Sequence, residues 1–187
     1  MNFKLLAKDL PVQPLLDAID PELWKIITTR QDYPGSAHHD TECIFLRWCR
    51  DQSLQAAFRD LDCEWMYPAE FLGLTPGPLL NAYLAPIVSH FYGEAMFKPF
   101  ELGRIILTNL HAGGVIDAHT DEGAYAEHFQ RFHLALQSDD GNEFFVGGES
   151  FQARPGELWW FDHRKDHEVI NDSARDRLHL IVDARPC

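Results

Sequence analysis

Two histidines and one aspartate in this chain have the types and spacing of a metal-binding triad. His119 and Asp121 stand two residues apart, so in an extended backbone their side chains point to the same side. His167 follows much later in the sequence. Two imidazoles and one carboxylate can occupy one face of an octahedral iron and leave the other positions open for substrate or oxygen. The three residues therefore predict a mononuclear iron site.

An arginine after the second histidine points to a second ligand. Arg177 offers a rigid guanidinium fork that matches a carboxylate, and it lies on a predicted strand otherwise rich in Leu and Ile. If it faces inward it needs an anion, because an unpaired buried charge is costly. A dicarboxylate that chelates iron through its 2-oxo acid end would supply one. The pattern predicts a non-haem Fe(II) oxygenase that consumes 2-oxoglutarate (2OG), although an ion pair with an internal acid remains an alternative for Arg177 and Arg131.

These side chains must be positioned by short strands in the C-terminal part of the chain. The predicted strands span residues 104–110, 131–137, 143–146, 158–161 and 177–183. Many short β-favouring runs separated by Gly, Pro and Asp turns are typical of a sandwich or a jelly-roll barrel. We predict a mainly β, cupin-like double-stranded β-helix with N-terminal helices. In this arrangement His167 is expected to reach the metal from the sheet opposite to that of His119.

Two of these strands alternate between polar and apolar residues. Arg177 and His179 share one face of the last strand, opposite a row of Leu and Val. Arg131 and His133 share one face of an earlier strand, opposite Phe and Leu. In a one-sided sheet such polar faces would be solvated, whereas in a jelly roll they would line a pocket between the sheets. The sequence leaves both possibilities open.

The whole chain, residues 1–187, is expected to form a single domain. Within it, residues 1–100 would form a helical or mixed layer, and residues 101–187 the β-helix core with the metal site. The elements expected in the N-terminal layer are a helix over 20–27 with Asp20 as N-cap, a loop over 30–40, a strand over 43–48 and a helix over 79–92 that contains Pro86.

Composition narrows the class of protein. With 16 basic and 29 acidic residues, the net charge of −13 disfavours binding to nucleic acid or to an anionic membrane. No apolar run approaches the roughly 18 residues of a membrane span, and the start of the chain lacks the apolar run of a signal peptide. We therefore expect a cytoplasmic protein with four reduced cysteines, whose spacing matches no metal or redox motif. Its oligomeric state is left open.

From Arg104 to Asp183 the chain resembles the aspartyl/asparaginyl β-hydroxylase family of Fe(II)- and 2OG-dependent dioxygenases, as a short bacterial-type member. The matching segments are Thr108…His119-Thr120-Asp121, Arg131-Phe132-His133-Leu134, Trp160 to Asn171 and Arg177 to Asp183. The resemblance implies that the catalytic iron ligands are His119, Asp121 and His167. It implies that the 2OG contacts are Arg177 at the C5 carboxylate, with Arg131, His133 and Thr108 as further polar contacts.

The resemblance also implies a reaction, which is hydroxylation by molecular oxygen of an aspartyl or asparaginyl residue or a related amino-acid-like substrate. Animal peptide hydroxylases of the family have a glycine where Asp121 stands, so the complete triad makes this chain more similar to bacterial relatives. Two alternatives remain. One is a hydroxylase of a free amino acid such as proline, or of another small metabolite. The other is a cupin-like module that binds metal or 2OG without turnover.

Overall fold

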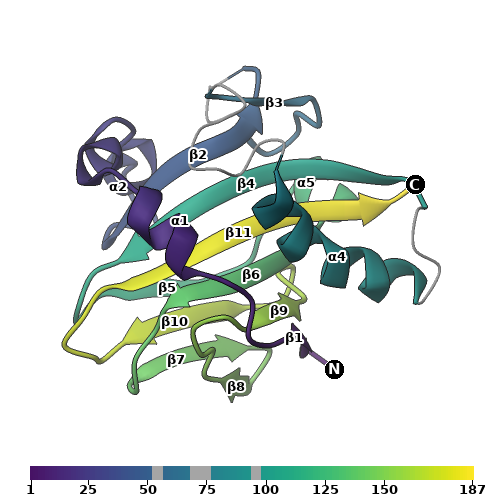
Figure 1. Ribbon diagram of the computed structural model, residues 1–187. Helices are drawn as coiled ribbons and strands as arrows, with labels where there is room; N and C mark the ends of the chain where they lie inside the picture. Colours follow the sequence, from purple (N-terminus) through teal and green to yellow (C-terminus); the bar gives the residue numbers. More distant parts are fainter. Residues whose placement is uncertain (52–56, 68–76, 94–97) are drawn as a thin grey trace.

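Two antiparallel sheets dominate the computed structural model, which describes residues 1–51, 57–67, 77–93 and 98–187 (Figure 1). In spatial order the strands of the large sheet are β1 (Phe3–Ala7), β9 (Leu158–Phe161), β6 (Gln130–Gln137), β11 (Arg177–Pro186), β4 (Phe100–Leu110), β2 (Thr41–Cys49) and β3 (Cys63–Trp65). Those of the small sheet are β5 (Val115–His119), β10 (His167–Asn171), β7 (Asn142–Val146) and β8 (Glu149–Phe151). The predicted mainly β, jelly-roll fold is confirmed.

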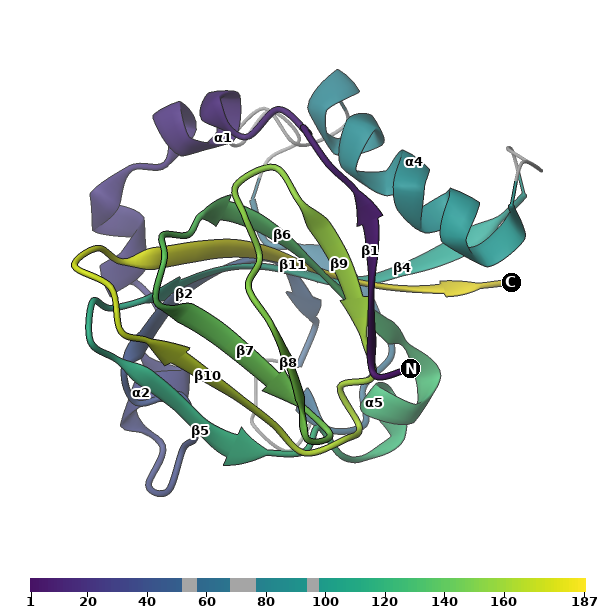
Figure 2. The ribbon, with the colours of Figure 1, turned by 90° about the horizontal axis from the view of Figure 1, so that it is seen from below.

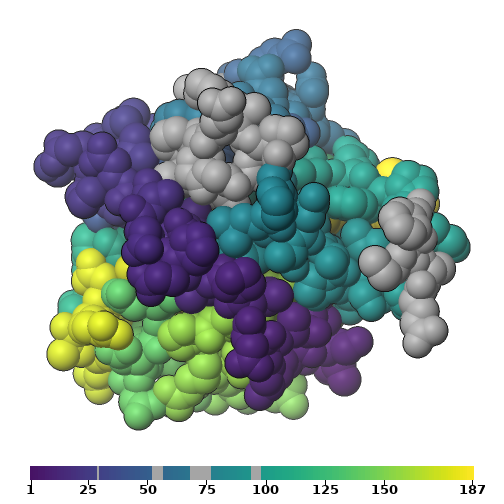
Figure 3. Space-filling view, viewed as in Figure 1, coloured from purple at the N-terminus to yellow at the C-terminus, as the bar shows by residue number. Residues whose placement is uncertain are grey.

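Two of the helices, α1 (Gln13–Ala18) and α4 (Pro78–Tyr92), cover the outer face of the large sheet (Figure 2). Other helical segments are η1 (Pro21–Lys25), α2 (Thr29–Asp32) and α5 (Ala124–His128). Seen from below, α1 and α4 lie on one side of the large sheet and the small sheet lies on the other (Figure 2). The space-filling view shows the N-terminal residues running across this helical face beside α4 (Figure 3). The large sheet is therefore covered on both faces.

The alternation along the strands divides the interior into two regions. Phe132 and Leu134 of β6 belong to the apolar cluster that includes residues of α1 and α4. Ala135 belongs to a second cluster, with Phe144 of the small sheet, between the two sheets. The polar residues that share the face of Ala135 therefore lie in the interior between the sheets. Of the two possibilities left by the sequence, the pocket is the one that the structure contains.

Several local expectations are confirmed, and two are corrected. The strand over 43–48 and the helix over 79–92, with Pro86 inside it, are present as β2 and α4. Asp20 is an N-cap whose side chain accepts from the backbone N–H of Glu22, but the segment that follows is a 3-10 helix and not an α-helix. The segment 30–40, which was expected to be a loop, starts inside helix α2. This helix could not be predicted, because four helical residues are too few to leave a periodic pattern.

The expectation that His167 comes from the sheet opposite to His119 is wrong. Strands β5 and β10 are antiparallel neighbours in the small sheet, and the two histidines are register partners. Residues directly opposite on such strands have Cβ atoms roughly 5 Å apart. Cross-strand pairing, and not contact across the barrel, therefore brings the two imidazoles together. The four cysteines are free. In the described part of the chain, no helix has the length and apolar character needed to cross a membrane.

Candidate metal centre

The triad residues converge beside the small sheet. His119 ends β5, His167 begins β10, and Asp121 follows β5 by two residues. One possible ligand atom from each lies within 4.8 Å of the others, and the two imidazole centroids are 4.2 Å apart. Among the described residues, this is the group of His, Cys, Asp or Glu side chains that meets such distances. The donor set is the two-histidine, one-carboxylate type that suits Fe(II).

Backbone carbonyls orient both imidazoles. Nδ1 of His119 donates to the carbonyl of Asp117 at 2.7 Å, and Nδ1 of His167 donates to the carbonyl of Lys165 at 2.9 Å. Because a carbonyl only accepts, each Nδ1 carries the hydrogen and each Nε2 keeps its lone pair for a metal. Burial lowers the pKa of His167 to about 4, against the opposing attraction of Asp121. The His167 ring is therefore neutral and ready to bind a metal.

Arg131 holds the carboxylate of the triad in its charged form. Its Nη1 donates to Oδ2 of Asp121 at 2.5 Å, while Oδ1 lies 4.0 Å from Nε2 of His119. Burial alone would raise the pKa of Asp121, but the Arg131 guanidinium lowers this pKa to about 2. One carboxylate oxygen is thus occupied by arginine, and the other faces the neighbouring ligand. This arrangement suits a carboxylate that binds metal through a single oxygen.

Arg131 is itself fixed by an internal acid. Its Nε and Nη2 donate to the two oxygens of Asp183, both at 2.9 Å, and the hydroxyl of Tyr125 donates to Asp183 at 3.1 Å. The pairing follows from register, because Arg131 and Asp183 are cross-strand partners on β6 and β11. The ion pair left open by the sequence is therefore present. Arg131 also lines the central cavity, so its predicted contact with 2OG stays a prediction.

Replacing Asp183 by asparagine is expected to weaken Fe(II) binding by roughly 10- to 100-fold, the usual loss when an outer-shell partner is removed. The amide keeps the shape of the side chain but releases Arg131, which in turn loosens Asp121. Anaerobic Fe(II) titration measures the effect. Asp139→Asn is the matched control, because Asp139 also accepts two hydrogen bonds from one arginine, but on the surface. Equal iron affinity in both variants would contradict the positioning role.

The side chains predicted from the sequence meet at one cavity between the sheets. Its lining includes all of them except Asp121, namely His119, His167, Arg177, Arg131, His133 and Thr108. Arg177 is 3% exposed, and its Nη2 donates to Nδ1 of His179 at 3.1 Å. Among the described residues, no carboxylate lies within ion-pair distance of it. Burial lowers the pKa of Arg177 to about 9, which marks an uncompensated internal cation.

Two histidines beside Arg177 also lack partners. Both ring nitrogens of His133 and Nε2 of His179 are buried without a hydrogen bond among the described residues. Each such group costs about 1–3 kcal/mol and calls for an explanation in a native structure. A carboxylate would accept from these donors and neutralise Arg177. The residues present therefore fit a dicarboxylate next to an iron ion.

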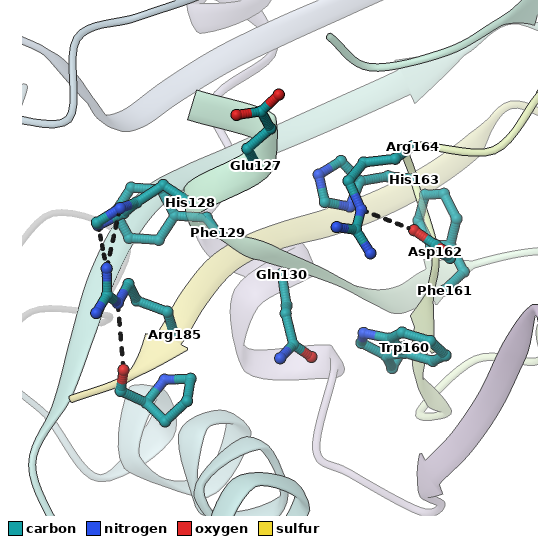
Figure 4. A pocket seen from close by; sticks show the side chains of 11 residues that line it. Glu127, His128, Phe129, Gln130, Trp160, Phe161, Asp162, His163, Arg164 and Arg185 are labelled. Atoms are coloured by element: carbon teal, nitrogen blue, oxygen red, sulfur yellow. Dashed lines mark hydrogen bonds and ion pairs between the residues drawn. The ribbon is translucent and has the colours of Figure 1, made fainter. Parts of the chain in front are cut away.

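A second pocket, of about 350 Å³, lies beside α5 (Figure 4). Figure 4 shows that both of its arginines have partners, with Arg185 against His128 and Arg164 donating to Asp162. The two cavities share Phe161, but the second contains none of the triad residues. Because both arginines of the second pocket have partners, the cavity between the sheets is the candidate site.

Two residues of the candidate site could not be predicted from the sequence. Arg30 of α2 and His38, which precedes β2, both line the cavity. The sequence indicates no role for His38, and Arg30 falls in the expected loop. Neither position belongs to a periodic pattern, so only the packing of α2 on β2 reveals them.

Comparisons with known proteins agree with this geometry. A family described as aspartyl/asparaginyl beta-hydroxylase has a model that matches residues 81–186. An oxidoreductase of the 2OG-Fe(II) oxygenase family from Burkholderia pseudomallei has a similar structure, with a TM-score of 0.57 at 18% identity over 90% of this chain and 80% of that one. The 2OG complex of a viral collagen prolyl hydroxylase from Paramecium Bursaria Chlorella virus-1 has a TM-score of 0.61 at 8% identity, over 100% and 97%. No curated protein matches the sequence significantly.

Proposed function

Since the chain belongs to the aspartyl/asparaginyl β-hydroxylase family and is an oxygenase that uses Fe(II) and 2OG, we propose that it hydroxylates an aspartyl or asparaginyl residue or a related amino-acid-like substrate. The oxygenase chemistry in this proposal is supported most directly by the position of two groups. A complete triad and a buried arginine without an acidic partner face the same cavity. The triad suits an iron ion, and the arginine suits the far carboxylate of a dicarboxylate.

Each residue has a distinct proposed task. His119, Asp121 and His167 would hold the iron, with Nε2 of each imidazole free for it. Arg177 would bind the C5 carboxylate of 2OG, and His133 and Thr108 would give further polar contacts. When bound, iron and 2OG supply the oxidising chemistry that adds a hydroxyl group to a C–H bond.

The apolar walls of the cavity have a separate task. Phe144, Phe161 and Val169 line it beside the polar groups. Walls of this kind exclude water from the reacting centre, which strengthens the interactions of the charged groups and limits side reactions. The substrate would enter from the side of the triad, where His119 is only partly buried.

Succinate formation from 2OG is the first test. The protein is loaded with Fe(II) without oxygen and then exposed to oxygen, alone and with peptides that contain Asp or Asn, or with free amino acids including proline. We expect slow succinate formation alone and faster formation with substrate, together with a product that has gained one oxygen atom. Comparing peptides with free amino acids distinguishes a hydroxylase of peptide residues from a hydroxylase of free amino acids. Binding of Fe(II) and 2OG without succinate in any arm would favour the non-catalytic module.

A further inference from the structure

A second arginine without an acidic partner faces the cavity from the N-terminal layer. Arg30 and His38 line it together with His119 and Arg131. Nη2 of Arg30 donates to Nε2 of His38 at 2.7 Å, and the His38 ring packs edge-on against His119 with centroids 4.8 Å apart. Both residues precede residue 81, where the family match begins. The pair thus adjoins the triad from a segment outside the family match.

His38 is a fixed and neutral acceptor. Its carbonyl accepts from the backbone N–H and the hydroxyl of Thr41, at 3.0 and 2.8 Å, which anchors it at the start of β2. A guanidinium only donates, so Nε2 of His38 accepts the hydrogen bond from Arg30. The ring therefore uses a lone pair to orient Arg30. It supplies no negative charge, so the guanidinium stays uncompensated.

Arg30 and Arg177 serve different parts of the cavity. Among the described residues, no carboxylate lies within ion-pair distance of Arg30. Arg30 is hydrogen-bonded to His38, whose ring packs against the triad residue His119, so the pair lies on the triad side of the cavity. Arg177 is hydrogen-bonded to His179 of β11, and its guanidinium lies over the ring of Phe144, 5.6 Å from the centroid. One bound anion is therefore not expected to satisfy both arginines.

A second anion is supported by a charge count for the site with iron and 2OG bound. The count includes the charged residues that line the cavity and the acids that pair with them. Iron brings two positive charges, and Arg30, Arg131 and Arg177 bring one each. Asp121 and Asp183 bring one negative charge each, and 2OG brings two. One positive charge is left over. Arg30 is half-buried, and an uncompensated charge shielded from water is costly, so a substrate with one carboxylate would complete the balance.

We propose that Arg30, oriented by His38, binds a carboxylate of the substrate, so that the enzyme selects carboxylate-bearing, amino-acid-like molecules. This inference rests on the oxygenase function proposed above and restricts it, since an asparaginyl residue within a peptide has no carboxylate. The anion is either the side chain of an aspartyl residue or the α-carboxylate of a free amino acid. Both present the two coplanar oxygens that a guanidinium fork matches.

Calorimetric titration of the protein loaded with Fe(II) and 2OG under nitrogen tests this inference without turnover. The probes are acetyl-aspartate amide, acetyl-asparagine amide and free asparagine, which carry a side-chain carboxylate, no carboxylate and an α-carboxylate. We expect at least one carboxylate probe to bind roughly tenfold or more tightly than acetyl-asparagine amide, as loss of a charged hydrogen bond implies. Arg30→Ala should remove this preference, and Arg30→Lys should keep part of it.

Arg50→Ala is the matched control, because Arg50 is an exposed arginine of the same layer that pairs with Glu64. It should keep the preference of the wild type. Discrimination that persists in Arg30→Ala, or a wild type without any carboxylate preference, overturns the proposal. A loss of 2OG affinity in Arg30→Ala as large as the loss for the probes also overturns it, because Arg30 would then serve the cofactor. Succinate formation in oxygen, without substrate, tests the oxygenase function separately on the same preparations.

Discussion

Replacing His167 by alanine is expected to abolish succinate formation from 2OG. The residue supplies one of three ligands, and its Nε2 is the only ring nitrogen free for the metal. Losing a ligand should cost more than the roughly 10- to 100-fold in affinity or activity that loss of an outer-shell partner costs. Anaerobic Fe(II) titration and succinate formation measure both consequences.

The control for this variant is His128→Ala. His128 is a histidine of the second pocket, where it pairs with Arg185, and it has no place in the triad (Figure 4). It should bind Fe(II) and form succinate as the wild type does. Thermal unfolding of both variants shows whether each is folded, since His167 packs against Phe161 with ring centroids 5.3 Å apart. Full activity in a folded His167→Ala protein would remove His167 from the iron site.

The polar pocket could be predicted from the sequence as far as local periodicity reaches. Alternation on β6 and β11 separates Arg131 and Arg177 from the apolar residues beside them. The same two-residue period places Asp121 beside His119. These relations depend only on the backbone being extended. They therefore hold whichever strands pair with β6 and β11.

What the sequence did not reveal depends on pairing between distant strands. The partner of Arg131 is Asp183 because β6 and β11 pair in one particular register, and that register is set by the whole core. The approach of His167 from the same sheet as His119 has the same origin. Arg30 lies beyond prediction for a different reason. A single side chain that reaches the cavity from the four-residue helix α2 leaves no repeating signal in the sequence.

Replacing Arg177 by methionine is expected to stabilise the protein without 2OG and to destroy 2OG binding. The guanidinium is buried with only neutral His179 as a polar partner. Replacing buried ionic groups by well-packed apolar residues is often neutral or stabilising, by about 1–4 kcal/mol. We therefore expect the free energy of unfolding, measured by denaturant titration, to rise within that range.

The sign of the effect follows from the pKa of Arg177. Burial lowers this pKa to about 9, below its value in the unfolded chain. A base with a lower pKa in the folded state carries its full destabilising penalty at every pH below about 9, and the penalty fades as pH rises from about 9 toward the pKa of the unfolded chain. At neutral pH the full penalty is present in the wild type. Methionine removes it at every pH, so the gain in stability should shrink in alkaline solution.

Adding 2OG should reverse the order of stability. A ligand at 1,000 times its dissociation constant stabilises the folded state by about 4.1 kcal/mol, which is at least as large as the gain expected from methionine. This stabilisation is expected for the Fe(II)-loaded wild type but not for Arg177→Met. Arg164→Met is the control, because Arg164 is an exposed arginine that pairs with Asp162. Arg164→Met should change neither the free energy of unfolding without 2OG nor the stabilisation that 2OG adds. If Arg177→Met unfolds more easily without 2OG, the charge of Arg177 is already compensated within the fold. The cavity would then have no uncompensated cation at that position, and the assignment of Arg177 to a dicarboxylate would lose its physical basis.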